Sequence, residues 1–409
     1  MATFAARIQQ VKPSQTKAMT QRARDLRAAG VDVIVLSQGE PDFDTPDHIR
    51  AAGIKAIDDG KTRYTPVAGV QELRQAVCRK FARDNGLQFK PDQITVGGGA
   101  KQVITNALLA TVDPGETVLF PAPCWTSYPD MVGIAEGTPV AIDCTQTDFK
   151  LTPAALDRAI TPTTRWLMLN SPSNPTGAVY SRQELAALAD VVHSHPHLWV
   201  MSDDIYEHLV HDEETFATMA QVAPDLQDRI LTVNGVSKAH AMTGWRIGYG
   251  AGPKDLIGKM NLLQSQTTSH ACSIAQYAAI EALDGPQDHL AVFTRAFRQR
   301  RDFVWDKLRQ APGLRCDRRP AGAFYLFVDC SEVIGAGTPD GSTLVSDSEF
   351  ASYLLEEAHV AVVPGTAFLG ENHIRISYAS SLDDLGEACD RIIAACERLE
   401  FNTKQAASS

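Results

Sequence analysis

Asn234-Gly-Val-Ser-Lys238 and Met242-Thr-Gly-Trp-Arg246 follow the apolar run Arg229–Val233, which we expect to form a buried strand. A lysine just past such a strand lies at the edge where open α/β sheets bind their ligands. The arginine eight residues later can return to the same place across a turn that contains glycine. Lysine forms Schiff bases with carbonyl groups, and a guanidinium group binds phosphate strongly. The stretch therefore predicts an open α/β sheet that binds an aldehyde carrying a phosphate, which describes pyridoxal 5′-phosphate.

Short apolar runs alternate with helical patterns on the N-terminal side of this stretch. The runs that we expect to be strands of the same sheet are 93–96, 116–120, 164–169 and 197–201. This alternation is typical of βαβ units around a mainly parallel sheet. Residues 245–249 are expected to return as an antiparallel strand. After about residue 290 the pattern changes to a long charged helix followed by three apolar runs, at 324–328, 361–363 and 373–378. This change predicts a second, smaller α+β domain.

The composition favours a cytoplasmic protein without nucleic-acid or membrane partners. The net charge of −11 over 409 residues opposes binding to nucleic acid and to anionic membrane surfaces. No apolar stretch reaches the roughly 18–20 residues that a membrane span requires. The eight cysteines are scattered without zinc-like spacing, so we expect reduced thiols and no metal site.

The segment Gly97-Gly-Gly-Ala-Lys101 joins an expected strand to an expected helix. Backbone N–H groups and the helix dipole at such a junction suit a phosphate group. The segment has neither the GxGxxG spacing of dinucleotide-binding proteins nor the GK[ST] ending of a P-loop, which weakens an oxidoreductase interpretation. A tight glycine turn without a ligand is the alternative. Because Arg246 can reach the same phosphate, we favour a cofactor site.

Polar and aromatic residues follow three further strand ends, where a pyridoxal ring requires partners. A carboxylate at Asp203 or Asp204 could pair with a protonated pyridine nitrogen and keep the ring an electron sink, whereas the alternative is a helix N-cap. Tyr206 could hydrogen-bond the ring's 3′ oxygen, and Asn174 could donate an amide hydrogen bond into the cleft. Trp125 could stack on the ring, although core packing is the default for a tryptophan.

Arg375 lies in the expected strand 373–378 with apolar neighbours on both sides. A charged side chain on a strand is usually solvated on the exposed face. The sharper alternative is a bidentate clamp for the carboxylate of a substrate.

These motifs resemble those of the class I aspartate aminotransferase family, which has pyridoxal-phosphate fold type I. They occur in the family's order and span nearly the whole chain. The segments that carry the resemblance are Ser37–Phe43, Tyr64–Gly69, Pro123–Tyr128, Asn170–Gly177, Ser202–Tyr206, Ser237–Lys238, Met242–Arg246, Val363–Gly365 and Ile374–Tyr378.

The resemblance implies an α/β fold with two domains. The large domain is expected to hold a mainly parallel, seven-stranded sheet flanked by helices, beside a smaller α+β domain. We expect residues 46–290 to form the large cofactor-binding domain and residues 291–400 the small domain. Residues 1–45 are expected to join the small domain, and residues 401–409 to form a tail.

The resemblance also implies roles for individual residues. Lys238 resembles the lysine that forms the Schiff base and then moves the proton. Asp203, in preference to Asp204, matches the partner of the pyridine nitrogen, and Tyr206 matches a ligand of the 3′ oxygen. The other residues expected in the cofactor site are Gly99, Ala100, Lys101, Trp125, Asn174, Ser237 and Arg246. Tyr64 resembles a tyrosine that reaches the phosphate of the neighbouring subunit, which implies a homodimer with shared active sites.

The expected substrate site combines a carboxylate clamp with polar and aromatic neighbours. Arg375 matches the family's clamp for the α-carboxylate, with a backbone contact from Gly39. The other residues expected to touch the substrate are Lys101, Trp125 and Asn174.

Two positions depart from the commoner family pattern. Gly235 stands where many members carry a phosphate-binding serine. The family's second arginine, which binds the distal carboxylate of a substrate, has no counterpart around residues 266–271. One subgroup uses a lysine at the position of Lys101 instead, which keeps a dicarboxylic substrate in view. His270 is a second residue that could modify this pocket.

The resemblance predicts a transaminase with ping-pong kinetics. The expected donor is aspartate or another dicarboxylic amino acid, and the acceptor is 2-oxoglutarate, oxaloacetate or glyoxylate. Aromatic or neutral amino acid specificity, or β-elimination on the same scaffold, is the alternative, because a fold does not fix function. A regulator that only senses the cofactor would need a basic DNA-binding segment, and the acidic chain offers none.

Overall fold

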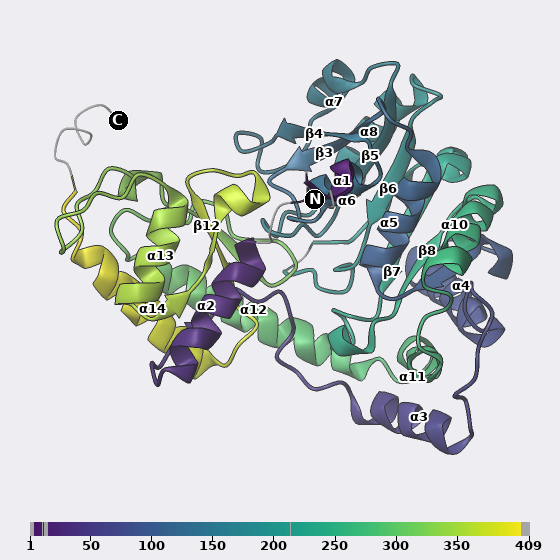
Figure 1. The fold of residues 1–409 in the computed structure, drawn as a ribbon, viewed down its shortest axis with the longest axis horizontal. Coiled ribbons are helices and arrows are strands. Elements are labelled where there is room, and N and C mark those ends of the chain that lie inside the picture. Colours follow the sequence, from purple (N-terminus) through teal and green to yellow (C-terminus); the bar gives the residue numbers. More distant parts are fainter. Residues whose placement is uncertain (1–3, 10, 12–14, 213, 402–409) are drawn as a thin grey trace.

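A computed structural model describes residues 4–9, 11, 15–212 and 214–401, arranged in two lobes of unequal size (Figure 1). The larger lobe holds a seven-stranded sheet with the strand order β2-β8-β7-β6-β5-β3-β4. Its strands are β2 (Ile94–Gly97), β3 (Thr117–Ala122), β4 (Thr138–Asp143), β5 (Thr164–Asn170), β6 (Trp199–Asp203), β7 (Ile230–Gly235) and β8 (Gly248–Ala251). All neighbours pair in parallel except β8, which is antiparallel to β2 and to β7. The prediction of a mainly parallel sheet with one returning strand is confirmed.

The strand β4 was not among the strands expected from the apolar runs. It lies at the sheet edge, and its residues alternate between exposed and half-exposed positions. An edge strand buries little side-chain surface, so its sequence lacks the apolar run that marks the central strands.

Helices cover both faces of this sheet, which is why its central strands β5, β6 and β7 are buried at almost every position. In β5, Leu167 and Leu169 belong to the same core cluster as residues of α4, α8 and α11, whereas Trp166 and Met168 belong to a second cluster with residues of α5, α6 and α10. The helices of the larger lobe are α3 (Asp47–Asp58), α4 (Gln71–Asn85), α5 (Ala100–Thr111), α6 (Tyr128–Ile134), α7 (Pro153–Ala159), α8 (Arg182–His193), α9 (Met219–Val222), α10 (Lys254–Thr267) and α11 (Ser273–Asp284). Short 3-10 turns lie at Pro91–Gln93, Pro224–Arg229 and Thr243–Trp245.

The smaller lobe is built around a three-stranded antiparallel sheet with the order β11-β12-β9. These strands are β9 (Tyr325–Asp329), β11 (Val363–Pro364) and β12 (His373–Ser377). The helices of this lobe are α2 (Gln15–Ala28), α13 (Asp347–Glu357) and α14 (Leu382–Glu397), with 3-10 turns at Ser331–Val333 and Gly365–Phe368. The long helix α12 (Asp288–Leu308) runs from the larger lobe into the smaller one (Figure 1). The smaller α+β unit expected after residue 290 is therefore present.

The N-terminal segment touches both lobes. The short helix α1 (Ala6–Gln9) contacts α6, whereas α2 packs on the smaller lobe (Figure 1). The strand β1 (Ile34–Val35) pairs in parallel with β10 (Val360–Ala361). The domain boundaries at residues 45, 290 and 400 stay predictions, and residues 402–409 of the expected tail lie outside the described residues.

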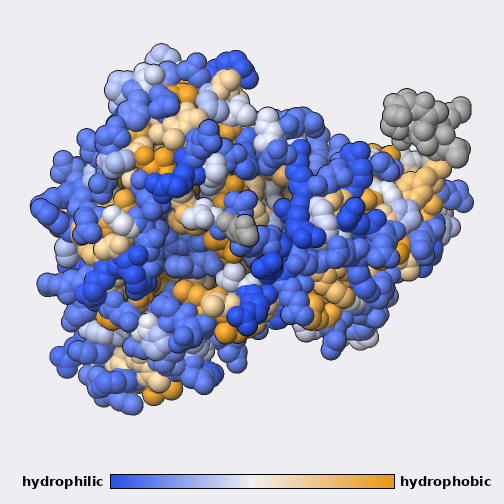
Figure 2. Space-filling model, turned by 180° about the vertical axis from the view of Figure 1, so that it is seen from behind, coloured by the Kyte–Doolittle hydropathy of each residue, from blue (hydrophilic) through white to orange (hydrophobic). Residues whose placement is uncertain are grey.

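The surface and the helices agree with the lack of a long apolar stretch in the sequence (Figure 2). On the face that Figure 2 shows, hydrophilic residues predominate and hydrophobic residues form separate patches. Within the described residues, every helix is too short or too polar to cross a lipid bilayer.

Candidate active site

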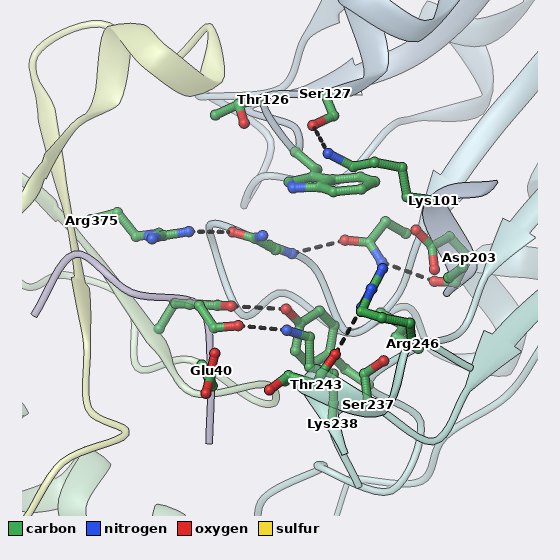
Figure 3. Close-up of a pocket in the computed structure, with 18 of the residues that line it drawn as sticks. Glu40, Lys101, Thr126, Ser127, Asp203, Ser237, Lys238, Thr243, Arg246 and Arg375 are labelled. Atoms are coloured by element: carbon green, nitrogen blue, oxygen red, sulfur yellow. Dashed lines mark hydrogen bonds between the residues drawn. The ribbon is translucent and has the colours of Figure 1, made fainter. Parts of the chain in front are cut away.

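A cavity of about 510 Å³ opens at the carboxyl ends of the central strands, where the two lobes meet (Figure 3). This is the place where open α/β sheets bind ligands. The predicted residues that line it are Gly39, Ala100, Lys101, Trp125, Asn174, Asp203, Tyr206, Ser237, Lys238, Arg246 and Arg375. The lining residues that were not predicted are Glu40, Thr126, Ser127, Asn170, Ile205, Thr243, Gly244 and Tyr325.

Asp203 ends β6 at the floor of the cavity, where it is buried. Its Oδ2 accepts a hydrogen bond of 2.6 Å from the Tyr128 hydroxyl, while its Oδ1 has no hydrogen-bond partner among the described residues. Burial raises the pKa of Asp203 to about 6, and the bond from Tyr128 opposes that rise. A buried carboxylate oxygen without a partner is costly, so this oxygen is suited to a cationic N–H group of a ligand.

Asp204 and the residues after it do not share this position. Asp204 is outside the cavity lining, and its Oδ1 accepts a 2.7 Å hydrogen bond from the Ser202 hydroxyl. Residues 205–208 form turns and no helix, so the alternative of an N-cap at this point is not seen. Asp203 lines the cavity and Asp204 does not, a distinction that the sequence spacing alone could not make.

Lys238 follows β7 and reaches the cavity from the opposite side to Ser127 (Figure 3). Its Nζ donates a hydrogen bond to the backbone carbonyl of Gly39 and lies 5.8 Å from the centre of the Tyr206 ring. Burial lowers the pKa of Lys238 to about 8, and the nearby Glu40 carboxylate opposes that shift. An amine with a lowered pKa has a larger neutral fraction near neutral pH, which is the form that attacks carbonyl groups.

The N-terminus of α5 forms a cradle beside Arg246. Gly99 caps this helix with a φ of +94° and no side-chain cap bond, so the first N–H groups of the helix are not taken by a side chain. A Cβ on Gly99 would lie 2.3 Å from a guanidinium nitrogen of Arg246, and a Cβ on Gly248 would lie 2.1 Å from the backbone nitrogen of Ala100. Glycines at both positions therefore let the arginine and strand β8 approach the helix end closely.

Gly235, the departure from the family's serine, has a packing reason. A Cβ at this position would lie 3.0 Å from the carbonyl oxygen of Ile247 and 3.1 Å from the Cα of Gly248. The two strands that carry these residues, β7 and β8, are paired directly here. A side chain at this position would be tightly packed, and its neighbours would have to move by a few tenths of an ångström to admit it.

Arg375 is a buried cation on β12, only 2% exposed. Its guanidinium donates to Asn174 Oδ1 at 3.0 Å and to the Ser37 carbonyl at 2.6 Å, while Nε has no partner among the described residues. It stacks on Tyr325 and Phe368, with centroid distances of 4.5 and 4.8 Å. It forms no ion pair with a carboxylate within the described part of the chain. An unpaired buried charge is unfavourable, so this group is suited to an anionic ligand. The alternative of a solvated surface arginine is wrong.

The end of the cavity near Lys101 is more open. The Nζ of Lys101 donates to the Ser127 hydroxyl at 2.9 Å and lies 4.7 Å from the centre of the Trp125 ring. Lys101 and Glu40 are exposed, and Trp125 is half-buried. The hydrogen-bonded pair of Lys101 and Ser127 thus lines the wall opposite Lys238 (Figure 3).

Tyr64 and His270 lie outside the cavity of their own chain. The Tyr64 side chain is 93% exposed, and its ring meets the His270 ring edge-on at 5.6 Å. Gly99 does not line the cavity either, although it caps the helix that does.

Three residues of the site, Tyr128, Asn170 and Tyr325, were not predicted, although two of them stand in segments that carry the resemblance. Tyr325 stands in an apolar segment, where an aromatic residue most often belongs to the core, whereas Tyr128 stands among polar residues after Trp125. Asn170 accepts from the backbone nitrogen of Asn174 and donates to the backbone carbonyl of Asp203. Its place at the end of an expected strand was the available signal for this residue.

A candidate metal group outside the cavity already holds an internal cation. Asp84, Glu207 and His208 bring three ligand atoms within 4.8 Å of one another. The buried ammonium group of Lys80 forms an ion pair with Glu207 at this point. Because this ammonium neutralises Glu207, the group does not require a metal.

Known proteins similar to this chain are aminotransferases. The family model described as aminotransferase class I and II matches residues 31–392. The aspartate/prephenate aminotransferase of Cereibacter sphaeroides is 56% identical over 400 residues, covering 98% of this chain and all of the relative. The aspartate aminotransferase of Rhizobium meliloti is 51% identical over 396 residues, covering 97% of this chain and 96% of the relative.

Solved structures show the same similarity. The crystal structure of the aspartate aminotransferase from Rhizobium meliloti has a TM-score of 0.95 at 50% identity, covering 98% of this chain and 100% of that chain. The Thermus thermophilus aspartate aminotransferase with maleate has a TM-score of 0.89 at 42% identity, covering 97% of this chain and 100% of that chain.

Proposed function

This chain belongs to the class I and II aminotransferase family, and we propose that it uses pyridoxal 5′-phosphate to exchange amino groups between dicarboxylic amino acids, above all aspartate, and 2-oxo acids. The observation that carries the proposal is the unpaired, buried guanidinium of Arg375, which faces the same cavity as Lys238. A cation of this kind matches a substrate carboxylate, and the amine beside it matches a carbonyl group.

The chemistry of the cavity residues supports this cofactor. The unpartnered Oδ1 of Asp203 matches a protonated pyridine nitrogen. The N-terminus of α5 at Ala100, with Arg246 beside it, matches a phosphate. Trp125 would cover the ring, and Asn174 and Tyr206 would hold its 3′ oxygen. When bound, the cofactor supplies an aldehyde that captures amines and a protonated ring that withdraws electrons.

Lys238 would act as the base. With a substrate held in the cavity, the Lys238 Nζ would remove the proton from the substrate Cα and hold it until it is returned. Its lowered pKa, about 8, suits a group that must take up and release a proton near neutral pH. Asp203 would stay ionised against the ring nitrogen, and Tyr128 would hold its carboxylate in place through Oδ2.

Arg375 and Gly39 would orient the substrate. Two guanidinium nitrogens can grip a carboxylate in a fixed plane, and this fixes which bond at Cα faces Lys238. The Asn174 side chain, which accepts from Arg375 at 3.0 Å, would link the clamp to the cofactor site. We propose ping-pong kinetics, because one site serves the donor and the acceptor in turn.

Lys101 supports a dicarboxylic substrate. It is the second lysine of the cavity lining, and its ammonium lies over Trp125, away from Arg375 (Figure 3). Two cations at opposite ends of one cavity match the two carboxylates of aspartate. Several relatives are named for both aspartate and prephenate, and prephenate is also a dicarboxylic 2-oxo acid. We therefore propose prephenate as an acceptor beside 2-oxoglutarate, oxaloacetate and glyoxylate.

We propose a homodimer in which Tyr64 serves the partner's site. Tyr64 is 93% exposed, yet its loop is firmly anchored. The buried amide of Gln276 donates to the Thr65 hydroxyl at 3.1 Å and accepts from the Val70 nitrogen at 2.7 Å. Ile54 and Ile57 on α3 are also more than half exposed, as an interface would require. A cytoplasmic location is likewise part of this proposal.

A half-reaction screen tests the proposed function. Loaded enzyme is mixed with single amino acids while the visible absorbance of the cofactor is followed. We expect aspartate and glutamate to remove this absorbance rapidly, and alanine and phenylalanine to do so slowly. Fast bleaching by phenylalanine alone would favour the aromatic alternative, and release of pyruvate and ammonia from a β-substituted alanine would favour the lyase.

A further inference from the structure

Tyr325 joins two parts of the site that come from different lobes. It begins β9 in the smaller lobe and is fully buried. Its hydroxyl lies 2.8 Å from the hydroxyl of Tyr206, which belongs to the turn after β6 in the larger lobe. Its ring lies against the guanidinium of Arg375, 4.5 Å from the ring centre. One side chain therefore touches both the carboxylate clamp and a residue proposed for the 3′ oxygen.

The register of the small sheet sets this geometry. Arg375 on β12 pairs with Phe327 on β9, and Tyr325 stands two residues before Phe327. Residues two apart on a strand share a face, so Tyr325 is the diagonal neighbour of Arg375 on the cavity side. The hydroxyl also sets the position of the N-terminal segment, because a Cβ on Gly39 would lie 2.7 Å from it. The Tyr325 side chain is thus packed on three sides.

Resting on the proposed function, we propose that Tyr325 is a positioning residue that holds the Tyr206 hydroxyl through its own hydroxyl and the Arg375 guanidinium through its ring. A phenol has one proton to donate. If Tyr206 donates that proton to the cofactor's 3′ oxygen, Tyr325 must be the donor between the two tyrosines. A donated bond to the Tyr206 oxygen strengthens the bond that Tyr206 donates. The two functions of Tyr325 can therefore be removed separately.

Three charged residues lie around the pair of Tyr206 and Tyr325. Arg375 faces Tyr325 from β12, Lys238 faces Tyr206 from the segment after β7, and Asp203 lies near Tyr206 at the end of β6. None of them is removed by a substitution of Tyr325, so a change in the spectrum reports on the hydroxyl pair.

The Tyr325→Phe variant removes the hydroxyl and keeps the ring. The measurement is a pH titration of the visible absorbance of loaded enzyme, together with the dissociation constant of maleate, a dicarboxylate without an amino group. We expect the midpoint of the titration to rise by about half a pH unit, since one hydrogen bond to Tyr206 is lost. We expect the maleate constant to change less than about twofold, because the ring remains on Arg375.

A double-mutant cycle separates positioning from a general structural effect. Tyr206→Phe is expected to raise the midpoint further, and Tyr325→Phe added to it should cause no additional shift. Tyr325→Leu, which removes the ring, is expected to weaken maleate binding about tenfold. Tyr180→Phe, at a buried tyrosine that bonds the Leu151 nitrogen outside the cavity, is the control and should leave both readouts unchanged.

Two results would overturn the inference. One is an unchanged midpoint in Tyr325→Phe, and the other is a shift of equal size in the Tyr206→Phe background. A wild-type protein that shows no visible absorbance with the cofactor would contradict the proposed function instead, so the two failures are distinguishable.

Discussion

The two ends of the cavity are built in opposite ways. At the inner end, Asp203 and Arg375 are almost completely buried, and each keeps a polar atom without a hydrogen-bond partner among the described residues. At the outer end, Lys101 is exposed to solvent. Asp203 ends a strand of the larger lobe and Arg375 lies on a strand of the smaller lobe, whereas Lys101 comes from the first turn of a helix.

This difference separates chemistry from selectivity. Buried charges interact strongly and have shifted pKa values, so the inner end must match its ligand closely. Exposed charges are screened by water and salt, so the outer end contributes weaker and more adjustable contacts. We therefore expect substitutions at the inner end to abolish turnover and substitutions at the outer end to change substrate preference.

The largest effect is expected for Lys238→Ala. Removing the base should lower kcat by about 10⁴-fold, because Lys101, the other lysine among the described lining residues, lies on the opposite wall (Figure 3). Stopped-flow measurement of the aspartate half-reaction checks this. Added methylamine, a small amine that can occupy the space left by the side chain, should restore part of the rate. A variant that keeps near wild-type turnover would contradict the role of Lys238.

Arg375→Leu should be the next most damaging change. We expect kcat/KM for aspartate to fall about 10³-fold, because the substrate carboxylate loses a buried, hydrogen-bonded partner. Arg375→Lys keeps the charge but cannot bind a carboxylate through two nitrogens. Its kcat/KM for aspartate should therefore lie between those of the wild type and Arg375→Leu. Steady-state kinetics of the three proteins check the order. Equal activity of the Leu and Lys variants would show that bidentate binding contributes nothing.

Tyr128→Phe probes the support under Asp203. Loss of the 2.6 Å bond to Oδ2 should lower kcat about tenfold, since a hydrogen bond to a charged group is removed. The KM for aspartate should change little, because the substrate clamp is intact. Tyr180→Phe is again the matched control, and a comparable loss of kcat in that variant would assign the effect to folding.

The pH dependence of cofactor capture tests the environment of Lys238. Its pKa, about 8 in the folded protein, lies below the ordinary lysine value, so the neutral amine accumulates as pH rises through 8. The rate at which cofactor-free protein captures pyridoxal 5′-phosphate should rise with pH around that midpoint. Glu40→Gln removes a charge that raises this pKa, and it should move the midpoint to lower pH. A midpoint near 10.5 would contradict the burial argument.

The smallest effect is expected at the outer end. Lys101→Met should lower kcat/KM for aspartate about tenfold and leave the slow alanine half-reaction unchanged, because alanine has no distal carboxylate. The ratio of the two half-reactions is the measurement. Lys254→Met, at an exposed lysine paired with Asp92 far from the cavity lining, is the control. Equal losses with aspartate and alanine would place Lys101 in cofactor binding only.

The sequence predicted the inner end better than the rest of the cavity. Lys238 and Asp203 follow apolar central strands, so their position at the sheet edge follows from local pattern alone. The choice between Asp203 and Asp204 depended on the family resemblance, and hydrogen bonds now distinguish them.

Contacts between distant segments could not be predicted in this way. Tyr325 meets Tyr206 across 119 positions of sequence, and Arg375 meets Ser37 across 338. No local periodicity encodes such pairings, because they arise from how the lobes pack. The edge strand β4 was missed for a different reason, since its half-exposed residues lack the apolar run of a buried strand.

The central claim is that the buried lysine and not the exposed one holds the cofactor. Loaded enzyme is reduced with borohydride, digested, and its peptides are sequenced by mass spectrometry. The account predicts the pyridoxyl phosphate label on the peptide that contains Lys238, with Lys101 unmodified. A label on Lys101, or no stable label on any lysine, would contradict it.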